Sequence, residues 1–251
     1  MKNVVNILVI ILIIALSIFS ISYTNEYLYE DTNIQKDSDK KEIVVITSKV
    51  TTTKKKEIKK NIYPIENITD EDVFKIFNEK QAMVIGDSMA EGLPAYEVLD
   101  NKNVVYTRGR RIDNMVKDMP KVIEYNPKYL FLSYGANDII KWNGDIEGFI
   151  NAYKNSISYI KEVLPDTIII INSVLPVSEK AINNKSAFTY QSEFNSKLME
   201  LCKSMEIDFL ENSRFLLEKE EPYGYDGIHP KRFFFYLWGR QMASYLNSKS
   251  L

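Results

Sequence analysis

A serine, a histidine and an aspartate stand in polar motifs that could together perform nucleophilic catalysis. Ser88 lies in a Gly-Asp-Ser-Met motif, and Asp226 and His229 lie in an Asp-Gly-Ile-His-Pro motif near the end of the chain. His229 is the only histidine among the 251 residues, so any mechanism that needs imidazole must use it. A serine hydroxyl attacks an acyl carbon efficiently when a base accepts its proton, and imidazole suits that role. Asp226, which precedes His229 on the same short loop, could hold the second ring nitrogen and set the tautomer.

A third polar motif, Gly-Ala-Asn-Asp at residues 135–138, could supply a hydrogen-bond donor to the same chemistry through Asn137. Each of the three motifs also has an ordinary structural interpretation. Gly-Asp-Ser is a common turn, Asp-Gly-Ile-His-Pro could be a surface loop, and Asn137 or Asp138 could cap a helix. Their order along the chain, their positions after predicted strands and the single histidine together favour the catalytic interpretation.

The last three quarters of the chain alternate between strand-like and helix-like segments. Short apolar runs bounded by turn residues predict strands at residues 82–85, 104–106, 129–134, 167–171 and 207–210. Amphipathic stretches predict helices at residues 113–125, 146–163, 188–204 and 233–246, and Thr69 with Asp72 could cap a short helix through Phe77. Strands separated by helices of this length predict an α/β fold with a mainly parallel sheet and helices on both faces.

In sheets of this kind, functional residues gather where the chain leaves the carboxyl ends of the strands. The Ser88 motif follows the first predicted strand, the Asn137 motif follows the third, and the His229 motif precedes the last predicted helix. We therefore expect the three motifs to meet at one edge of the sheet.

In these motifs the chain resembles the SGNH hydrolases, also called the GDSL esterase/lipase family, from Gln81 to the end. The resemblance implies a three-layer α/β/α sandwich with a mainly parallel five-stranded, flavodoxin-like sheet. It also implies a catalytic triad of Ser88, Asp226 and His229. The family's oxyanion hole corresponds here to the Ser88 amide, the Gly109 amide and the Asn137 side chain, with Gly109 following the second predicted strand.

The first part of the chain differs in composition from the rest. Residues 1–23 contain an almost uninterrupted apolar run, which is close to the length that spans a bilayer as a helix. This predicts an N-terminal membrane anchor with an extracytoplasmic domain; the alternative is a signal peptide that is cleaved to release a secreted protein. Residues 24–68 are rich in charged residues and threonine and predict a flexible spacer, which leaves residues 69–251 as the hydrolase domain.

Composition excludes several other classes of partner and site. A net charge of -2 gives no general attraction to nucleic acid. The only cysteine, Cys202, lies in a helix-like stretch and can form neither an intramolecular disulfide nor a cysteine zinc cluster. We expect no metal site and no cofactor.

The substrate is less clearly indicated than the chemistry. Arg108, Arg110 and Arg111 flank Gly109, and arginine pairs well with carboxylate and phosphate groups, so these residues could select an anionic polymer. The alternative is a solvated arginine surface. Tyr134 and Trp142 lie near Asn137 in the sequence and could form a shelf on which a sugar stacks, or could be ordinary packing residues.

The sequence therefore predicts an extracytoplasmic serine esterase that acts through an acyl-serine intermediate, either an O-deacetylase or an O-acetyltransferase of an acylated surface glycan. One alternative is a lipase or lysophospholipase, which would need a wide apolar groove. The sequence does not identify such a groove, and loop residues such as Leu93, Phe188 and Phe233 are the places to look for it. The other alternative is a catalytically silent glycan-binding module.

Overall fold

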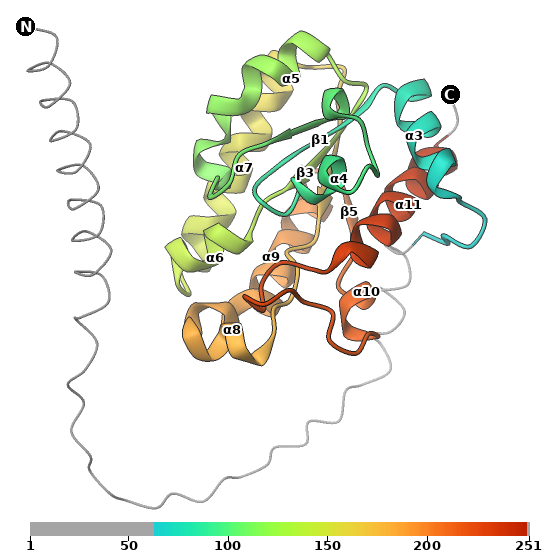
Figure 1. Ribbon diagram of the computed structural model, residues 1–251. Helices are drawn as coiled ribbons and strands as arrows, with labels where there is room; N and C mark the ends of the chain where they lie inside the picture. The colour runs from blue at the N-terminus through green and yellow to red at the C-terminus, as the bar shows by residue number, and fades with distance from the viewer. Residues whose placement is uncertain (1–62, 250–251) are drawn as a thin grey trace, which may run out of the picture. The chain divides into compact units, whose positions relative to one another are not determined.

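The computed structural model describes residues 63–249 (Figure 1). The predicted anchor at residues 1–23 and spacer residues 24–62 lie outside the described residues, so what the sequence predicts for them stays a prediction. Within residues 63–249, none of the helices combines the length and the apolar character needed to cross a membrane.

A parallel sheet of five strands forms the centre of the described chain. The strands lie in the order β2-β1-β3-β4-β5, and every neighbouring pair is parallel. They are β1 (Ala82–Gly86), β2 (Val104–Tyr106), β3 (Tyr129–Ser133), β4 (Ile168–Asn172) and β5 (Asp208–Leu210). All five predicted strands are confirmed.

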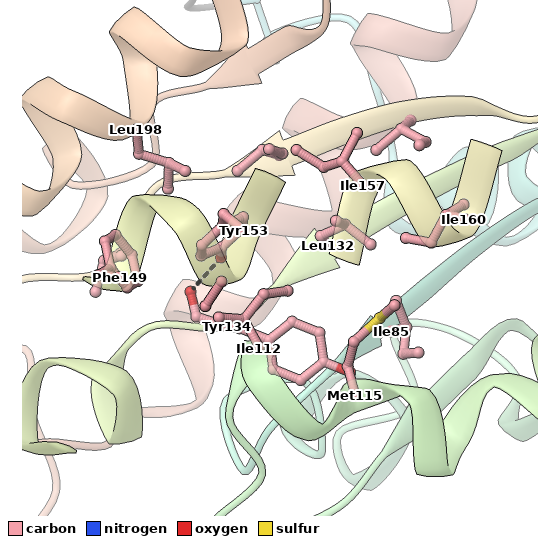
Figure 2. Packing of buried hydrophobic residues seen from close by; sticks show 14 of the residues in the cluster. Ile85, Ile112, Met115, Leu132, Tyr134, Phe149, Tyr153, Ile157, Ile160 and Leu198 are labelled. Carbon is pink, nitrogen blue, oxygen red and sulfur yellow. Dashed lines mark hydrogen bonds between the residues drawn. The ribbon is translucent and has the colours of Figure 1, made fainter. Parts of the chain in front are cut away.

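Alternate residues of each strand enter opposite layers, which is what makes the fold a three-layer sandwich. Met83 and Ile85 of β1 belong to one buried cluster, whereas Ala82 and Val84 belong to the other. Figure 2 shows the first cluster, in which Ile85 lies among side chains from neighbouring elements. Because both faces of the strands are buried, the strand sequences are continuous apolar runs rather than alternating ones.

Helices cover each face of the sheet. The first buried cluster is built with η3 (Ile112–Asp118), α5 (Met119–Tyr125), α6 (Ala136–Trp142), α7 (Ile146–Val163), α8 (Glu179–Asn184), η4 (Ser186–Tyr190) and α9 (Gln191–Ser204). The second is built with α3 (Asp70–Glu79), α4 (Gly92–Ala95), α10 (Arg214–Leu217) and α11 (Arg232–Ser248). The short 3-10 turn η2 (Asn101–Asn103) leads into β2. In Figure 1, α3 and α11 lie side by side although they come from opposite ends of the described chain.

Two helix predictions differ from the structure in their boundaries. The stretch predicted as one helix at residues 113–125 is the 3-10 segment η3 followed by α5, because Pro120 lacks the N–H that a continuous helix needs and is tolerated only in a first turn. The helix predicted from Phe188 begins at Gln191, after η4. The helix after Thr69 is confirmed: Thr69 and Asp72 form a capping box.

The folded part of the chain begins earlier than the predicted boundary at residue 69. Tyr63, Ile65 and Ile68 pack against the second buried cluster, and the Tyr63 ring meets the Tyr245 ring edge-on at 5.3 Å. The charged composition of residues 24–68 obscured these apolar side chains, so residues 63–68 belong to the domain rather than to the spacer.

Candidate active site

Ser88 lies on the turn that follows β1, at the carboxyl edge of the sheet. The preceding residue, Asp87, is fully buried, and its Oδ1 accepts a hydrogen bond from the Met89 N–H at 2.9 Å. This bond closes the turn around Ser88. The serine side chain is therefore presented from a backbone segment that a buried carboxyl group holds in place.

The His229 motif forms a closed loop before α11. Tyr223 and Pro230 form an isolated antiparallel bridge, and the Gly224 N–H donates to the His229 carbonyl at 2.8 Å. The Tyr223 hydroxyl also donates to the Pro176 carbonyl, which ties the loop to the segment after β4. These contacts bring the end of the chain back to the edge of the sheet where Ser88 lies.

Asp226 uses both carboxylate oxygens inside this loop. Oδ1 accepts from the N–H groups of Ile228 at 2.9 Å and His229 at 3.0 Å, while Oδ2 lies 2.5 Å from His229 Nδ1. Partial burial acts to raise the pKa of Asp226, but the hydrogen bonds from the His229 ring and from the two amides outweigh it and hold the pKa below its ordinary value. Asp226 is thus ionised at neutral pH and fixes the proton of the ring on Nδ1.

The other ring nitrogen faces the serine. His229 Nε2 lies 2.9 Å from Ser88 Oγ, across 141 positions of sequence. With Nδ1 protonated and held by Asp226, Nε2 is the acceptor and the Ser88 hydroxyl is the donor. The structure therefore brings Ser88, His229 and Asp226 into one continuous hydrogen-bonded line.

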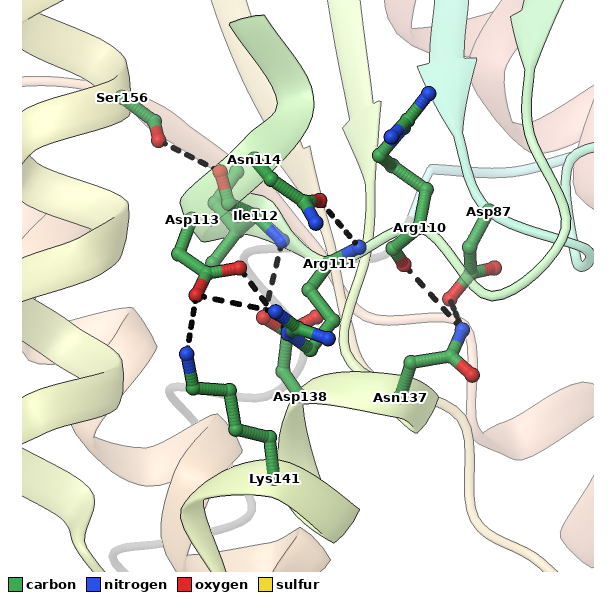
Figure 3. A network of polar contacts seen from close by, with 10 residues as sticks. All are labelled: Asp87, Arg110, Arg111, Ile112, Asp113, Asn114, Asn137, Asp138, Lys141 and Ser156. Carbon is green, nitrogen blue, oxygen red and sulfur yellow. Dashed lines mark hydrogen bonds and ion pairs between the residues drawn. The ribbon is translucent and has the colours of Figure 1, made fainter. Parts of the chain in front are cut away.

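Hydrogen-bond donors from two further loops adjoin this line. Asn137 lies in the first turn of α6 and donates through Nδ2 to Asp87 Oδ2 at 3.0 Å and to the Arg110 carbonyl at 3.3 Å (Figure 3). Gly109 follows β2 with φ at 72°, a conformation that favours glycine, and nothing lies within 4 Å of where a Cβ would be. Among residues 63–249, the backbone N–H groups of Ser88 and Gly109 have no hydrogen-bond acceptor.

The GDSL-like lipase/acylhydrolase family model matches residues 84–232, which is more than half of the chain and includes Ser88, Asn137 and His229. The chain belongs to this family. It is a hydrolase that acts on ester bonds, and the resemblance noted in the sequence is confirmed.

Solved structures share the fold of this GDSL-like esterase at low sequence identity. A candidate acylhydrolase from Bacteroides fragilis is 16% identical with a TM-score of 0.57, and the match covers 77% of this chain and 93% of that one. An acetylxylan esterase from Geobacillus stearothermophilus is 12% identical with a TM-score of 0.51, covering 66% and 94%. A family 3 carbohydrate esterase from Talaromyces cellulolyticus is 14% identical with a TM-score of 0.50, covering 67% and 99%. A comparison with curated protein sequences gives no significant match.

The arginines around Gly109 in this esterase are each paired with a carboxylate. Arg110 is largely buried and binds Asp118 through two hydrogen bonds of 2.6 and 2.8 Å. Arg108, whose side chain is 77% exposed, makes a similar two-bond pair with Glu91, and Arg111 pairs with Asp113. Arg110 is therefore a structural residue of the loop, and Arg108 is matched by Glu91, whereas Arg111 shares Asp113 with Lys141. The selection of an anionic polymer by these arginines stays a prediction.

The two aromatic residues suggested as a sugar shelf do not lie together at the serine. Tyr134 is only 3% exposed and is packed in the core, because it continues the inward-facing alternation of Leu130 and Leu132. Trp142 lies at the end of α6 and lines a cavity between η3 and α7. A shelf formed by both residues beside Ser88 is therefore not what the structure shows.

Two buried carboxyl groups, Asp87 and Asp138, adjoin Asn137. Burial raises the pKa of Asp87 to about 6, against hydrogen bonds from Met89 and Asn137 that lower it. Burial likewise raises the pKa of Asp138 to about 7; its Oδ1 accepts from the Ile112 N–H at 3.0 Å. Asn137 and Asp138 therefore do not cap α6 through their side chains, which instead hold the loops on either side.

Two residues at the site were missed by sequence reasoning. Glu91, three positions after Ser88, holds Arg108 at the rim of the site. Tyr225 is 95% exposed directly before Asp226, with Lys180 Nζ 3.8 Å above its ring. Because Tyr225 directly precedes Asp226, its place in the sequence could have identified it as a residue near the site. Among the described residues, no group of three or more His, Cys, Asp or Glu side chains is arranged to hold a metal ion.

Proposed function

We propose that the chain is an extracytoplasmic serine esterase that acts through an acyl-Ser88 intermediate on O-acetylated glycan. The observation that carries the catalytic part is the line from Ser88 Oγ to His229 Nε2 at 2.9 Å and from His229 Nδ1 to Asp226 Oδ2 at 2.5 Å. The geometry matches the division of roles that a serine nucleophile, a general base and an orienting carboxylate require.

In the first half of the reaction, Ser88 Oγ attacks the ester carbonyl carbon while its proton passes to His229 Nε2. The resulting imidazolium is stabilised by Asp226, and the carbonyl oxygen becomes an oxyanion. When the tetrahedral intermediate collapses, the bond to the sugar oxygen breaks, and that oxygen takes the proton from Nε2. The products are the free sugar hydroxyl and an acyl-serine.

The oxyanion would be stabilised by the Ser88 and Gly109 N–H groups, which have no acceptor of their own among the described residues, and by Asn137. The bond from Asn137 to the Arg110 carbonyl is 3.3 Å, beyond the usual range for N–H···O, so it is the bond that an oxyanion would replace. The shorter bond to Asp87 would keep the amide oriented during that exchange.

In the second half, water attacks the acyl-serine while His229 Nε2 accepts a proton from it. When this second tetrahedral intermediate collapses, the bond between the acyl carbon and Ser88 Oγ breaks, Oγ takes the proton from Nε2, and the carboxylic acid is released. The Asp226 and His229 side chains are both 45% exposed, so water has direct access to the base. This openness favours hydrolysis over transfer, because a transferase must exclude water from its acyl-enzyme.

We propose acetylated glycan rather than lipid as the substrate because an apolar groove for a long acyl chain is not found at the residues where it was sought. Two of the three places where an acyl groove was to be looked for, Leu93 and Phe188, are buried in the two core clusters, and Phe233 is partly exposed. Two of the structural neighbours are a carbohydrate esterase and an acetylxylan esterase, which is compatible with the same substrate class. The predicted anchor at residues 1–23 and the spacer would place the domain within reach of a surface polymer.

Ester cleavage by the full-length chain in mild detergent tests the proposal. We expect nitrophenyl acetate to be cleaved faster than nitrophenyl octanoate, Ser88→Ala to abolish both activities, and the exposed-serine control Ser158→Ala to have no effect. Preference for octanoate would instead support the lipase alternative. Folded protein without Ser88-dependent cleavage of either ester would support the silent binding module. Removal of the domain by protease added to intact cells tests the extracytoplasmic location.

A further inference from the structure

A cavity of about 500 Å³ lies between η3 and α7, outside the line of Ser88, His229 and Asp226. Its volume is within the range of small-molecule sites, about 300 to 1,000 Å³. The floor is apolar and is formed by the buried side chains of Ile112, Met115 and Ala152. The catalytic residues do not line it, so catalysis by the triad does not account for it.

An aromatic ring forms one wall of the cavity. Trp142 packs against Gly148, where a Cβ would come within 2.5 Å of the indole ring, so only glycine allows the ring to lie this close to α7. Lys141 Nζ lies 4.8 Å from the centre of the ring and pairs with Asp113. The indole is therefore held in a defined position at the cavity.

Polar side chains without partners line the helix side of the cavity. Asn151 and Asn155 lie one turn apart on α7 and are exposed, and their side chains make no hydrogen bond to any described residue. The Tyr159 hydroxyl, one turn further on, makes none either. Asparagine is a poor helix former, so two of them in a helix interior slightly destabilise α7. They offer both donors and acceptors to whatever occupies the cavity.

The cavity adjoins the oxyanion loop through Ile112. The Ile112 N–H donates to Asp138, the neighbour of Asn137, and the Ile112 carbonyl accepts from Ser156 of α7 at 2.9 Å (Figure 3). A chain molecule whose ester lies at Ser88 could therefore extend along this loop into the cavity.

We propose that this cavity is a second subsite that binds a saccharide unit of the glycan chain, with an apolar sugar face against Trp142 and hydroxyl groups bonded to Asn151 and Asn155. An aromatic wall with carboxamides at the rim matches the two surfaces of a pyranose. A purely apolar ligand would leave the amides unpaired. The nearby carboxylate of Asp113 already pairs with both Arg111 and Lys141, so it offers no free negative charge to a cationic ligand. This inference rests on the proposed function.

Tryptophan fluorescence tests the subsite without any catalysis. The chain has two tryptophans, and the other one, Trp238, is 2% exposed in the opposite layer. Titration of full-length Ser88→Ala protein with xylotetraose, and separately with tetra-N-acetylchitotetraose, should give a saturable emission change with at least one of the sugars. The change should disappear in Trp142→Phe, and affinity should fall about tenfold or more in Asn151→Ala/Asn155→Ala because hydrogen bonds are lost.

The double variant Asn183→Ala/Asn184→Ala on α8, which makes the same chemical change elsewhere, should bind as before. No saturable change with either sugar, or a change that persists in Trp142→Phe, would overturn the proposal. In active protein that keeps Ser88, Asn151→Ala/Asn155→Ala should raise KM for acetylated xylan but leave cleavage of nitrophenyl acetate unaltered. If wild-type protein does not cleave nitrophenyl acetate, that result counts against the esterase mechanism. The sugar titration with Ser88→Ala protein would still decide whether the subsite exists.

Discussion

Replacing Asp226 by Asn separates the role of this residue in catalysis from its role in the loop. In the wild type, Oδ1 accepts two backbone N–H groups and Oδ2 accepts the His229 ring N–H. An asparagine has one acceptor and one donor group, so it can satisfy only one of the two sides. If Oδ1 keeps the two amides, the NH2 group faces Nδ1 and forces the ring proton onto Nε2, where it blocks acceptance from Ser88.

In the competing arrangement, the asparagine oxygen faces His229 Nδ1 and the productive tautomer is kept. The backbone N–H groups of Ile228 and His229 then face the asparagine NH2 group, which is itself a donor. At about 1 kcal/mol for each hydrogen bond, this arrangement is disfavoured by about 2 kcal/mol, so only a few per cent of molecules would adopt it. The stabilisation of the imidazolium by a full negative charge is lost as well. In triads of this type the same change costs about 10,000-fold in kcat. Because the Asp226 side chain is 45% exposed and water can partly replace it, we expect about 1,000- to 10,000-fold here.

The same reasoning predicts little effect of Asp226→Asn on stability, because the two amide bonds are retained. Asp226→Ala removes them and should lower the free energy of unfolding by about 2 kcal/mol more. Stopped-flow cleavage of nitrophenyl acetate and urea denaturation measure the two quantities in the same preparations. A loss in kcat of less than tenfold for Asp226→Asn, or equal destabilisation by the two variants, would refute the assigned orientation of the carboxylate.

Three further predictions follow from the loops around the triad. Asn137→Ala should lower kcat about 100- to 1,000-fold through loss of an oxyanion donor, measured on the same nitrophenyl ester, whereas an unchanged kcat would remove Asn137 from the mechanism. Arg110→Met should lower the free energy of unfolding in urea by about 3 to 5 kcal/mol because Asp118 is left buried and unpaired, whereas Arg108→Met, at an exposed pair, should cost at most about 1 kcal/mol. Asp87 has a folded-state pKa of about 6, above its ordinary value, so the folded state binds the extra proton and stability falls as pH rises from about 4 to about 6. Asp87→Asn should remove up to about 3 kcal/mol of that fall, and an identical pH profile of urea midpoints in wild type and variant would contradict the raised pKa.

The sheet could be predicted because its strands carry their own signal. Parallel strands covered on both faces are short apolar runs that end at turn residues, as in the runs before Gly86 and after Thr167. The sequence predicted helix existence better than helix boundaries. Pro120 sits inside a helical periodicity, and only the three-dimensional path shows that the chain uses a 3-10 segment up to Asp118 and begins a new helix around the proline.

The meeting of Ser88, Asp226 and His229 could be predicted because the chain has a single histidine, an aspartate lies three positions before it, and Ser88 directly follows a strand. The substrate residues could not be predicted in the same way. Tyr134 was placed near Asn137 by sequence distance, although a count of two from Leu132 points it into the core. Sequence distance measures proximity along the chain, whereas the side of the sheet is decided by the alternation of the strand.

The sequence did not predict which carboxylates pair with Arg108 and Arg110. Arg110 pairs with Asp118, the last residue of η3, and Arg108 pairs with Glu91, 17 positions earlier in the chain. These pairs draw the bulky side chains away from the path of the backbone at Gly109, where the N–H has no acceptor among the described residues and the space for a Cβ is empty. We therefore expect the loop that carries Gly109 to depend on the Arg110–Asp118 pair for its shape. A variant that breaks this pair should misplace the Gly109 donor and lose kcat together with stability, even though neither side chain takes part in the reaction.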